Sequence, residues 1–183
     1  MNRNDALALV KDYLKNTKLI KHVLAVEAIM EKLADYYSED KELWGRTGLL
    51  HDIDYELIQG DMTKHTLSVE SILSDKVDNT LIRAIKAHNY EQSGVNPNSV
   101  MEKSLISADT VSGLIIACAH VMPSKKLEEV TVGTISKKFQ DRSFARGSER
   151  ERIVVCESIG LSNEKLFKIA LEALKGIGDD LGL

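Results

Sequence analysis

Apolar residues recur with the 3.6-residue period of an α-helix along nearly the whole chain, and this pattern constrains the fold more than any other feature. The pattern appears in the ranges 5–14, 23–33, 43–51, 69–73, 81–88, 105–116, 153–159 and 166–174. No segment shows clear strand alternation, although EEVTVGTI (128–135) is ambiguous. We therefore predict an all-α fold, and no shift in composition divides residues 1–183 into two domains.

Capping residues predict where several of these helices begin. Asp5 is a candidate cap for the first helix, and Thr63 for a helix that carries His65 in its first turn. Ser99 and Glu102 form a capping box that begins a long helix. Residues 53–63 contain Gly60 and many polar groups and predict a loop. The last eight residues, GIGDDLGL, are typical of a solvated tail.

Composition and charge narrow the classes of function. The net charge of −4 lacks the basic excess of most nucleic-acid-binding proteins, so no stable nucleic-acid binding is expected. The isolated Cys118 and Cys156 predict reduced core thiols. No apolar run reaches the ~20 residues of a membrane span, and the N-terminus is charged too early for a signal peptide. These features predict a soluble, cytoplasmic protein.

Six polar residues interrupt the apolar pattern at helix ends or on inner helical faces: His22, His51, Asp52, His65, His88 and Asp109. Any single histidine there is explained better as a hydrogen-bonded core residue. Asp109 is harder to explain, because a carboxylate on an inner face costs several kcal/mol (~2 to 5) without a cation or strong donors. One shared cation explains all six, and mixed imidazole and carboxylate ligands suit Mn, Fe, Co, Ni or Zn, with Mg as an alternative.

The order of these residues resembles the HD superfamily of metal-dependent phosphohydrolases over roughly residues 18–120. The resemblance rests on His22, the doublet His51-Asp52 in GLLHDIDYE, and Asp109 on a later helix. His65 in KHTLSVESIL and His88 in IKAHN resemble the two extra histidines of dinuclear members. The resemblance implies an HD-domain-like helical bundle with a metal-binding core, followed by a C-terminal helical extension over residues 124–183.

The same resemblance implies a set of metal ligands. One divalent metal ion is expected on His22, His51, Asp52 and Asp109. Asp52 would bridge to a second ion, which also takes His65 and His88. Asp52, Asp54 and Glu56 are the candidate catalytic residues, the last two for proton transfer, although acids in a loop are equally often plain surface residues. Tyr55 fits either a lid over the site or core packing.

The implied activity is hydrolysis of a phosphomonoester or phosphodiester by a metal-activated water, with a nucleotide or another small phosphorylated metabolite as substrate. Two other classes stay open. Some HD-fold proteins use a mixed-valence di-iron centre for oxygenation with a ligand set of this composition. The chain could also be a binding module that senses a nucleotide and holds a structural metal.

Two departures from the family bear on the substrate. Many members follow the doublet with Ile-Gly-Lys, whereas this chain has Ile53, Asp54 and Tyr55 and so lacks the phosphate-binding lysine. The glycine-tyrosine-proline signature of cyclic-dinucleotide phosphodiesterases is also absent, which favours a mononucleotide or a diadenosine-type polyphosphate.

Positive charge for the substrate phosphate must therefore come from elsewhere. The basic residues after Pro123 are the richest source: Lys125, Lys126, Lys137, Lys138, Arg142 and Arg146. Lys137 and Arg142 are the first candidates to bind phosphate at the metal site, and the alternative is a solvated basic surface.

Overall fold

The computed structural model describes residues 1–183 and contains helices and turns but no β-strand. The α-helices are α1 (Arg3–Tyr13), α2 (Thr17–Tyr37), α3 (Lys41–Leu50), α4 (Val69–Leu73), α5 (Asn79–His88), α6 (Tyr90–Ser93), α7 (Val100–His120), α8 (Val132–Gln140), α9 (Arg150–Ile153), α10 (Asn163–Lys175) and α11 (Gly178–Leu181). Three 3₁₀ helices are η1 (Met62–Lys64), η2 (Leu127–Glu129) and η3 (Val154–Ile159). The predicted all-α class is confirmed.

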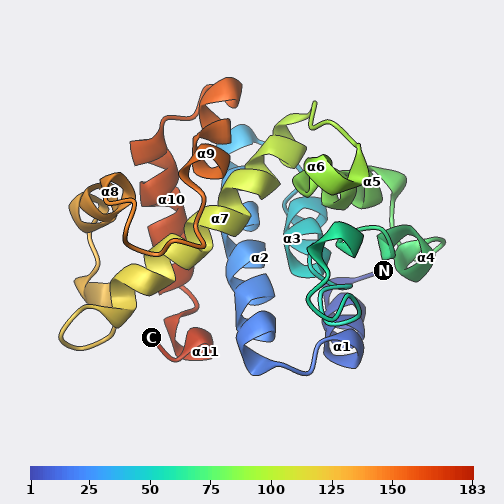
Figure 1. The fold of residues 1–183 in the computed structure, drawn as a ribbon, viewed down its shortest axis with the longest axis horizontal. Coiled ribbons are helices and arrows are strands. Elements are labelled where there is room, and N and C mark those ends of the chain that lie inside the picture. The colour runs from blue at the N-terminus through green and yellow to red at the C-terminus, as the bar shows by residue number, and fades with distance from the viewer.

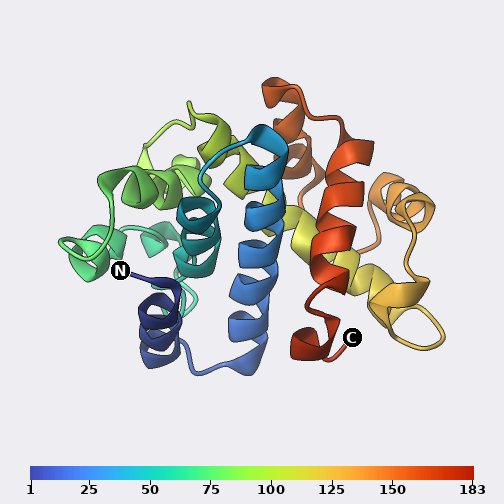
Figure 2. The same ribbon diagram turned by 180° about the vertical axis from the view of Figure 1, so that it is seen from behind.

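The two longest helices, α2 and α7, have 21 residues each and cross near the middle of the molecule (Figure 1). α1 and α3 lie on one side of α2, while α10 runs beside α2 on the other side (Figure 2). Two hydrophobic clusters fill the interior. The larger cluster is built mainly from α2, α7 and α10, and the smaller one from α1, α3, α4 and α5.

At the start of most helices a polar side chain accepts a hydrogen bond from a backbone N–H group that has no partner within the helix, and the sequence predicts residues of this kind as caps. Ser99 and Glu102 form the predicted capping box of α7, with both reciprocal hydrogen bonds present. The cap of α1 is Asn2, not Asp5: the backbone N–H of Asp5 donates to the Asn2 side chain at 3.0 Å. The choice of Asp5 was wrong because either residue satisfies the capping preference and only the backbone decides between them.

The segment around Thr63 also differs from the prediction. Met62–Lys64 forms a single 3₁₀ turn capped by Asp61, and His65 follows it with an extended backbone. Thr66 then takes a left-handed conformation with φ of 71°, so α4 begins only at Val69. His65 is therefore held by a turn instead of a helix, and this turn aims its ring into the molecule.

Two further stretches take a more ordered form than expected. The ambiguous stretch 128–135 forms no strand: η2 and α8 occupy its two ends, and only Val130 and Thr131 between them are extended. The C-terminal residues are not a solvated tail, because α11 returns the chain to the core and buries Leu181 and Leu183. Lys21 on α2 donates to the carbonyl oxygen of Leu181 at 2.7 Å and ties this end down. In the last eight residues glycines and aspartates outnumber the two leucines, so the composition does not indicate that this segment is buried.

Cys118 and Cys156 are buried and unpaired, as predicted for core thiols. Burial raises the pKa of the Cys118 thiol to about 11 and that of the Cys156 thiol to about 12, so both stay protonated at neutral pH. None of the helices is both long and apolar enough to cross a membrane.

A glycine allows α2 and α3 to approach closely. A Cβ atom at Gly48 on α3 would lie 2.8 Å from the carbonyl oxygen of Val26 and 2.9 Å from the backbone of Glu27. The obstacles are backbone atoms of α2, which cannot rotate away as a side chain can. Gly48 therefore sets the spacing of the two helices that carry His22 and His51.

Replacing Gly48 with alanine should lower the free energy of unfolding by about 1–3 kcal/mol, because the added methyl group overpacks the contact between α2 and α3. Urea denaturation followed by circular dichroism would measure the change. Gly133→Ala on α8 is a matched control with space for a methyl group, and it should raise stability by up to ~1 kcal/mol. Equal stability of the Gly48→Ala protein and the wild type would contradict the close approach.

Candidate metal centre

Asp52 lies at the centre of a cluster of histidines that come from distant parts of the chain. Its Oδ1 is 3.3 Å from His51 Nε2, 3.2 Å from His65 Nε2 and 3.7 Å from His88 Nε2. Its Oδ2 is 3.6 Å from His22 Nε2. One carboxylate thus faces four imidazole nitrogens, an arrangement in which a bridging ligand could serve two ions.

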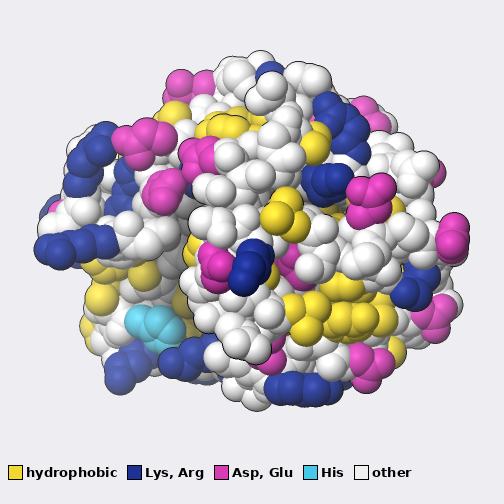
Figure 3. Space-filling view, turned by 45° about the vertical axis from the view of Figure 1, so that its right-hand side comes forward, with side chains coloured by type: hydrophobic (Ala, Val, Ile, Leu, Met, Phe, Trp, Pro, Cys, Tyr) yellow, Lys and Arg dark blue, Asp and Glu magenta, His cyan; other side chains and the backbone are white.

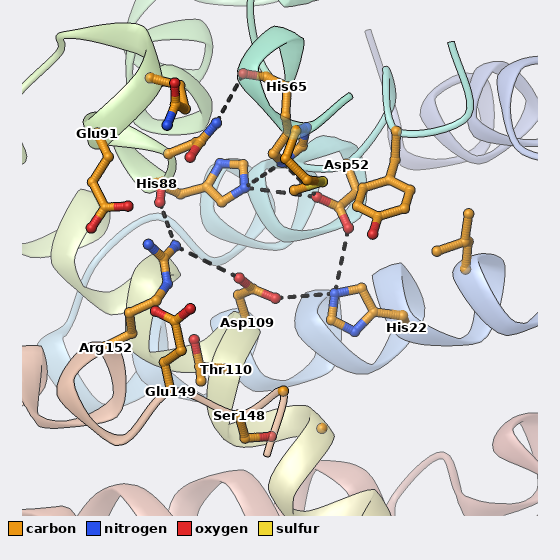
Figure 4. Close-up of a pocket in the computed structure, with 17 residues that line it drawn as sticks. His22, Asp52, His65, His88, Glu91, Asp109, Thr110, Ser148, Glu149 and Arg152 are labelled. Carbon is orange, nitrogen blue, oxygen red and sulfur yellow. Dashed lines mark hydrogen bonds and ion pairs between the residues drawn. The ribbon is translucent and has the colours of Figure 1, made fainter. Parts of the chain in front are cut away.

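Asp109 on α7 completes the cluster on one side. Its Oδ1 lies 3.1 Å from His22 Nε2 and 3.7 Å from His51 Nε2. Two overlapping groups of side chains have their ligand atoms close enough together to hold an ion, one with His22, His51 and Asp109 and one with His51, Asp52 and His88. The six residues selected from the sequence therefore converge at one place, and Figure 4 shows five of them around one cavity.

Each histidine is oriented by a hydrogen bond from its other ring nitrogen. His51 follows the last turn of α3, and its Nδ1 lies 2.7 Å from the carbonyl oxygen of Gly48. His88 ends α5 in the same way and bonds the carbonyl oxygen of Ile85. A carbonyl oxygen can only accept, so Nδ1 carries the proton and Nε2 keeps its lone pair.

His65 and His22 follow the same rule with other partners. His65 Nδ1 lies 3.0 Å from Asp54 Oδ1, and His22 Nδ1 lies 3.3 Å from Ser112 Oγ. The Ser112 hydroxyl donates its own proton to the carbonyl oxygen of Asp109, which leaves the oxygen free to accept from His22. Four Nε2 lone pairs and two carboxylates therefore face one another.

Such a set of acceptors lacks the donors that would make it stable by itself. When the imidazoles are neutral, as metal ligands must be, His65 Nε2 and His88 Nε2 are two acceptors 3.1 Å apart, and the buried His51 Nε2 has no hydrogen-bond partner. Cations satisfy every one of these atoms, and a mixed set of imidazoles and carboxylates suits first-row divalent metals. The residues present thus fit a metal centre.

The pKa values indicate the same demand for positive charge. Burial lowers the pKa of His65, but the Asp52 and Asp54 carboxylates outweigh it and raise the pKa to about 9. Burial raises the pKa of Asp52, yet the surrounding imidazoles hold that pKa well below its usual range, and His22 and His51 do the same for Asp109. Burial lowers the pKa of His88. Without metal, protons on the histidines balance the carboxylates.

The cluster opens into a cavity of 580 Å³, a size typical of small-molecule sites. His22 and Asp109 have side chains that are each 24% exposed and face this cavity, whereas the His51 side chain is fully buried behind them. Tyr55 lines the cavity and packs edge-on against the His65 ring, with 5.6 Å between ring centroids. It also packs against the smaller hydrophobic cluster, as the core-packing alternative expects, while a role as a lid stays a prediction.

Asp54 and Glu56 do not line the cavity, and their role in proton transfer stays a prediction. Asp54 is fully buried and accepts from His65 Nδ1 and the backbone N–H of Ser68, so it orients a histidine and is no surface acid either. Glu56 accepts from the backbone N–H groups of Lys15 and Asn16 and fixes the start of α2. Asp54 thus orients His65, and Glu56 holds the start of α2, the helix that carries His22.

Lys137 and Arg142 are likewise not brought to the cavity, contrary to the prediction. Lys137 is exposed on α8. Arg142 is 78% exposed and pairs with Glu151 at 2.9 Å. The α8 helix packs against α7 and α10 away from the histidines, and the helical period of its own sequence could not reveal that placement.

Arg152 is the cation that lines the cavity, and the sequence analysis missed it. It bonds the carbonyl oxygen of His88 and lies 3.9 Å from Asp109 Oδ2 (Figure 4). The only signal in the sequence is the charged stretch SERER at 148–152, which resembles any solvated segment. Its position depends on how the C-terminal part folds back over α7.

Metal binding should release protons from the metal-free protein, because His65, with a pKa of about 9, is protonated at neutral pH and a ligand must be neutral. The sign follows directly: apparent affinity for Mn²⁺ or Zn²⁺ should rise as pH increases from ~6.5 to ~9 and then level off. Calorimetry in buffers of different ionisation enthalpy should detect about one proton or more at pH 7.5. Proton uptake, or affinity independent of pH, would contradict the arrangement.

Comparison with known proteins places this sequence in a family. The family model described as "HD domain" matches residues 19–117. The chain is 28% identical over 159 residues to Ribonuclease Y of Aster yellows witches'-broom phytoplasma, covering 83% of this chain and 29% of the relative. It is 25% identical over 173 residues to Ribonuclease Y of Bacillus subtilis, and 29% identical over 174 residues to that of Enterococcus faecalis; each match covers 89% of this chain and 32% of the relative.

The chain thus spans about a third or less of the length of these relatives. No solved structure matches the chain. The matched range contains all six residues of the cluster, from His22 to Asp109, and ends before Arg152. On the basis of this family model, the chain belongs to the HD domain family.

Proposed function

We propose that this protein is a metal-dependent phosphohydrolase that cleaves a phosphomonoester or phosphodiester of a small substrate with a metal-activated water. The observation that carries the proposal is the set of acceptors around Asp52, in which four imidazole Nε2 atoms and two carboxylates meet at an open cavity. Divalent metal ions bound there lower the pKa of a water toward ~7 and stabilise negative charge at phosphorus.

We assign the ligands to two ions, with Asp52 shared between them. His22, His51, Asp52 and Asp109 would hold one ion, and Asp52, His65 and His88 the other. Contacts beyond the ligands support the direction of the ligand atoms. The carbonyl oxygens of Gly48 and Ile85 and the Asp54 carboxylate hold the Nδ1 protons of His51, His88 and His65, so their Nε2 lone pairs stay directed toward Asp52.

The size and charge of the site favour a small substrate. The cavity holds 580 Å³, and basic and acidic side chains are interspersed on the face shown in Figure 3, without a continuous basic surface on that face. The relatives are named ribonucleases, which supports cleavage of a phosphate ester and makes a phosphodiester one of the bonds to test. A nucleotide combines these properties.

Asp52→Ala should abolish metal binding and hydrolysis together, because Asp52 is the one carboxylate that faces all four histidines. Metal content would be measured by elemental analysis. Turnover of p-nitrophenyl phosphate and bis-p-nitrophenyl phosphate would be measured with Mn, Mg, Fe, Co, Ni or Zn. His120→Ala is the matched control, since His120 is exposed at the end of α7 and outside the cavity.

Full metal content and activity in the Asp52→Ala protein would overturn the site. A wild-type protein that binds metal but hydrolyses neither ester, mononucleotides nor a short RNA would overturn the hydrolase function. Oxygen consumption by the iron-loaded protein in place of ester hydrolysis would favour the oxygenase class.

His65→Ala and His88→Ala separate one metal ion from two. Each variant should keep about one ion per chain while losing most activity, because His22, His51 and Asp109 still form one group of ligands. The loss should exceed the ~10- to 100-fold typical of residues that merely orient ligands. A wild-type protein that binds a single ion at saturating metal would rule out the dinuclear assignment.

A further inference from the structure

Arg152 presents unused hydrogen-bond donors to the cavity. Its Nη2 bonds the carbonyl oxygen of His88 and lies near Asp109, but its Nε and Nη1 have no protein partner. Neither atom is buried without a partner, so both stay accessible to solvent, and the side chain lines the cavity. A guanidinium with free donors beside a metal cluster is well suited to bind a phosphate oxygen.

Two carboxylates flank this arginine without pairing with it. Glu91 on α6 and Glu149, which precedes α9, are exposed and line the same cavity. Neither side chain makes a hydrogen bond or ion pair, and Glu149 does not cap α9 although it holds the capping position. Figure 4 shows both near Arg152, on the side away from His22. They place negative charge next to the space that a substrate would occupy beyond its phosphate.

The buried Arg150 side chain fixes the loop that precedes Glu149. Arg150 is buried, and the five N–H groups of its guanidinium are shared among six main-chain carbonyl oxygens within hydrogen-bond distance, namely those of Lys138, Phe139, Asp141, Phe144, Ala145 and Ser148. These bonds hold residues 138–148 to the start of α9. The wall that presents Glu149 and Arg152 is therefore preorganised, which favours selective binding.

We propose that this wall selects phosphate esters that carry a single phosphate group and an organic part with hydroxyl or amino donors, and that it rejects a second anionic group. Arg152 binds the phosphate beside the metal cluster, while Glu91 and Glu149 accept hydrogen bonds from the organic part. The proposal rests on the proposed hydrolase function. It deepens that function by naming the class of substrate.

The negative charges of Glu91 and Glu149 disfavour binding of substrates with further anionic groups. A second phosphate or a carboxylate would have to lie among Glu91 and Glu149, where like charges repel and no further lysine or arginine lines the cavity. A hydroxyl or ammonium group at the same place gains acceptors. Asn89, Gln92, Thr110 and Ser148 add neutral polar groups to the lining, and few apolar side chains join them. The lining therefore suits a polar, uncharged or cationic organic part.

Non-hydrolysable benzylphosphonates test the selection without depending on turnover. Three compounds carry a carboxylate, a hydroxymethyl or an aminomethyl group at the 4-position, and calorimetry would measure their dissociation constants on the manganese-loaded protein. The carboxylate compound should bind at least about tenfold more weakly than the aminomethyl compound. In Glu91→Gln/Glu149→Gln this ratio should fall about tenfold. The control Glu164→Gln/Glu172→Gln removes the same charge on α10, outside the cavity, and should keep the wild-type ratio.

Arg152→Ala should weaken all three phosphonates about tenfold or more while metal content stays at the wild-type level. Arg152→Lys should recover part of the loss, because it restores the charge without the planar fork. Unchanged binding in Arg152→Ala would overturn the assignment. Loss of metal would also overturn it, since Arg152 would then act through Asp109 alone.

Hydrolysis of p-nitrophenyl phosphate by the same protein separates this inference from the function it rests on. Turnover together with equal binding of the three phosphonates would overturn the substrate class and leave the hydrolase function intact. Selective phosphonate binding without turnover of any ester would overturn the hydrolase function and support the selective wall.

Discussion

The buried Asp52 carboxylate is the constraint on which the site depends, because its charge needs a positive partner that no buried lysine or arginine supplies. Four imidazole nitrogens surround it within 3.2–3.7 Å, and each histidine holds its Nδ1 on another partner so that Nε2 faces the centre. An isolated buried charge costs several kcal/mol. In the metal-free protein, protons bound to the histidines can balance the carboxylate charge. Divalent cations would balance it while also satisfying the Nε2 lone pairs.

Helix ends supply the orientation that this site needs. His51 follows α3 and His88 ends α5, and each directs its Nδ1 proton to the carbonyl oxygen three residues earlier. The last carbonyls of a helix lack partners within the helix, so the histidine satisfies one of them while its own tautomer is fixed. The glycine at position 48 gives one of those carbonyls and also lets α2 and α3 approach closely. Packing and site geometry are coupled at this residue.

The cavity is built from two parts of the chain, one inside the range that matches the family model and one beyond it. The part that matches the family model provides the histidines and aspartates, whereas Ser148, Glu149 and Arg152 come from residues beyond it. Arg150 fixes that second part through hydrogen bonds to backbone carbonyl oxygens, and Phe139, Phe144 and Ala145 pack it against the larger hydrophobic cluster. The proposed hydrolase function therefore depends on residues within the family match, whereas the proposed substrate selection depends largely on residues beyond it.

The sequence by itself determined the helical class and the six residues of the cluster, because helical periodicity and the ligating capacity of His and Asp are local properties that survive without tertiary information. It does not reveal that Lys137, Arg142, Asp54 and Glu56 lie outside the cavity or that Arg152 lines it, because the place of a charged side chain depends on where its element packs. An Asp in a polar loop looks the same whether it is exposed or, like Asp54, buried against a histidine. Only the folding of the C-terminal helices across α7 decided which cation would face the cavity, since that choice arises from contacts between residues far apart in the chain.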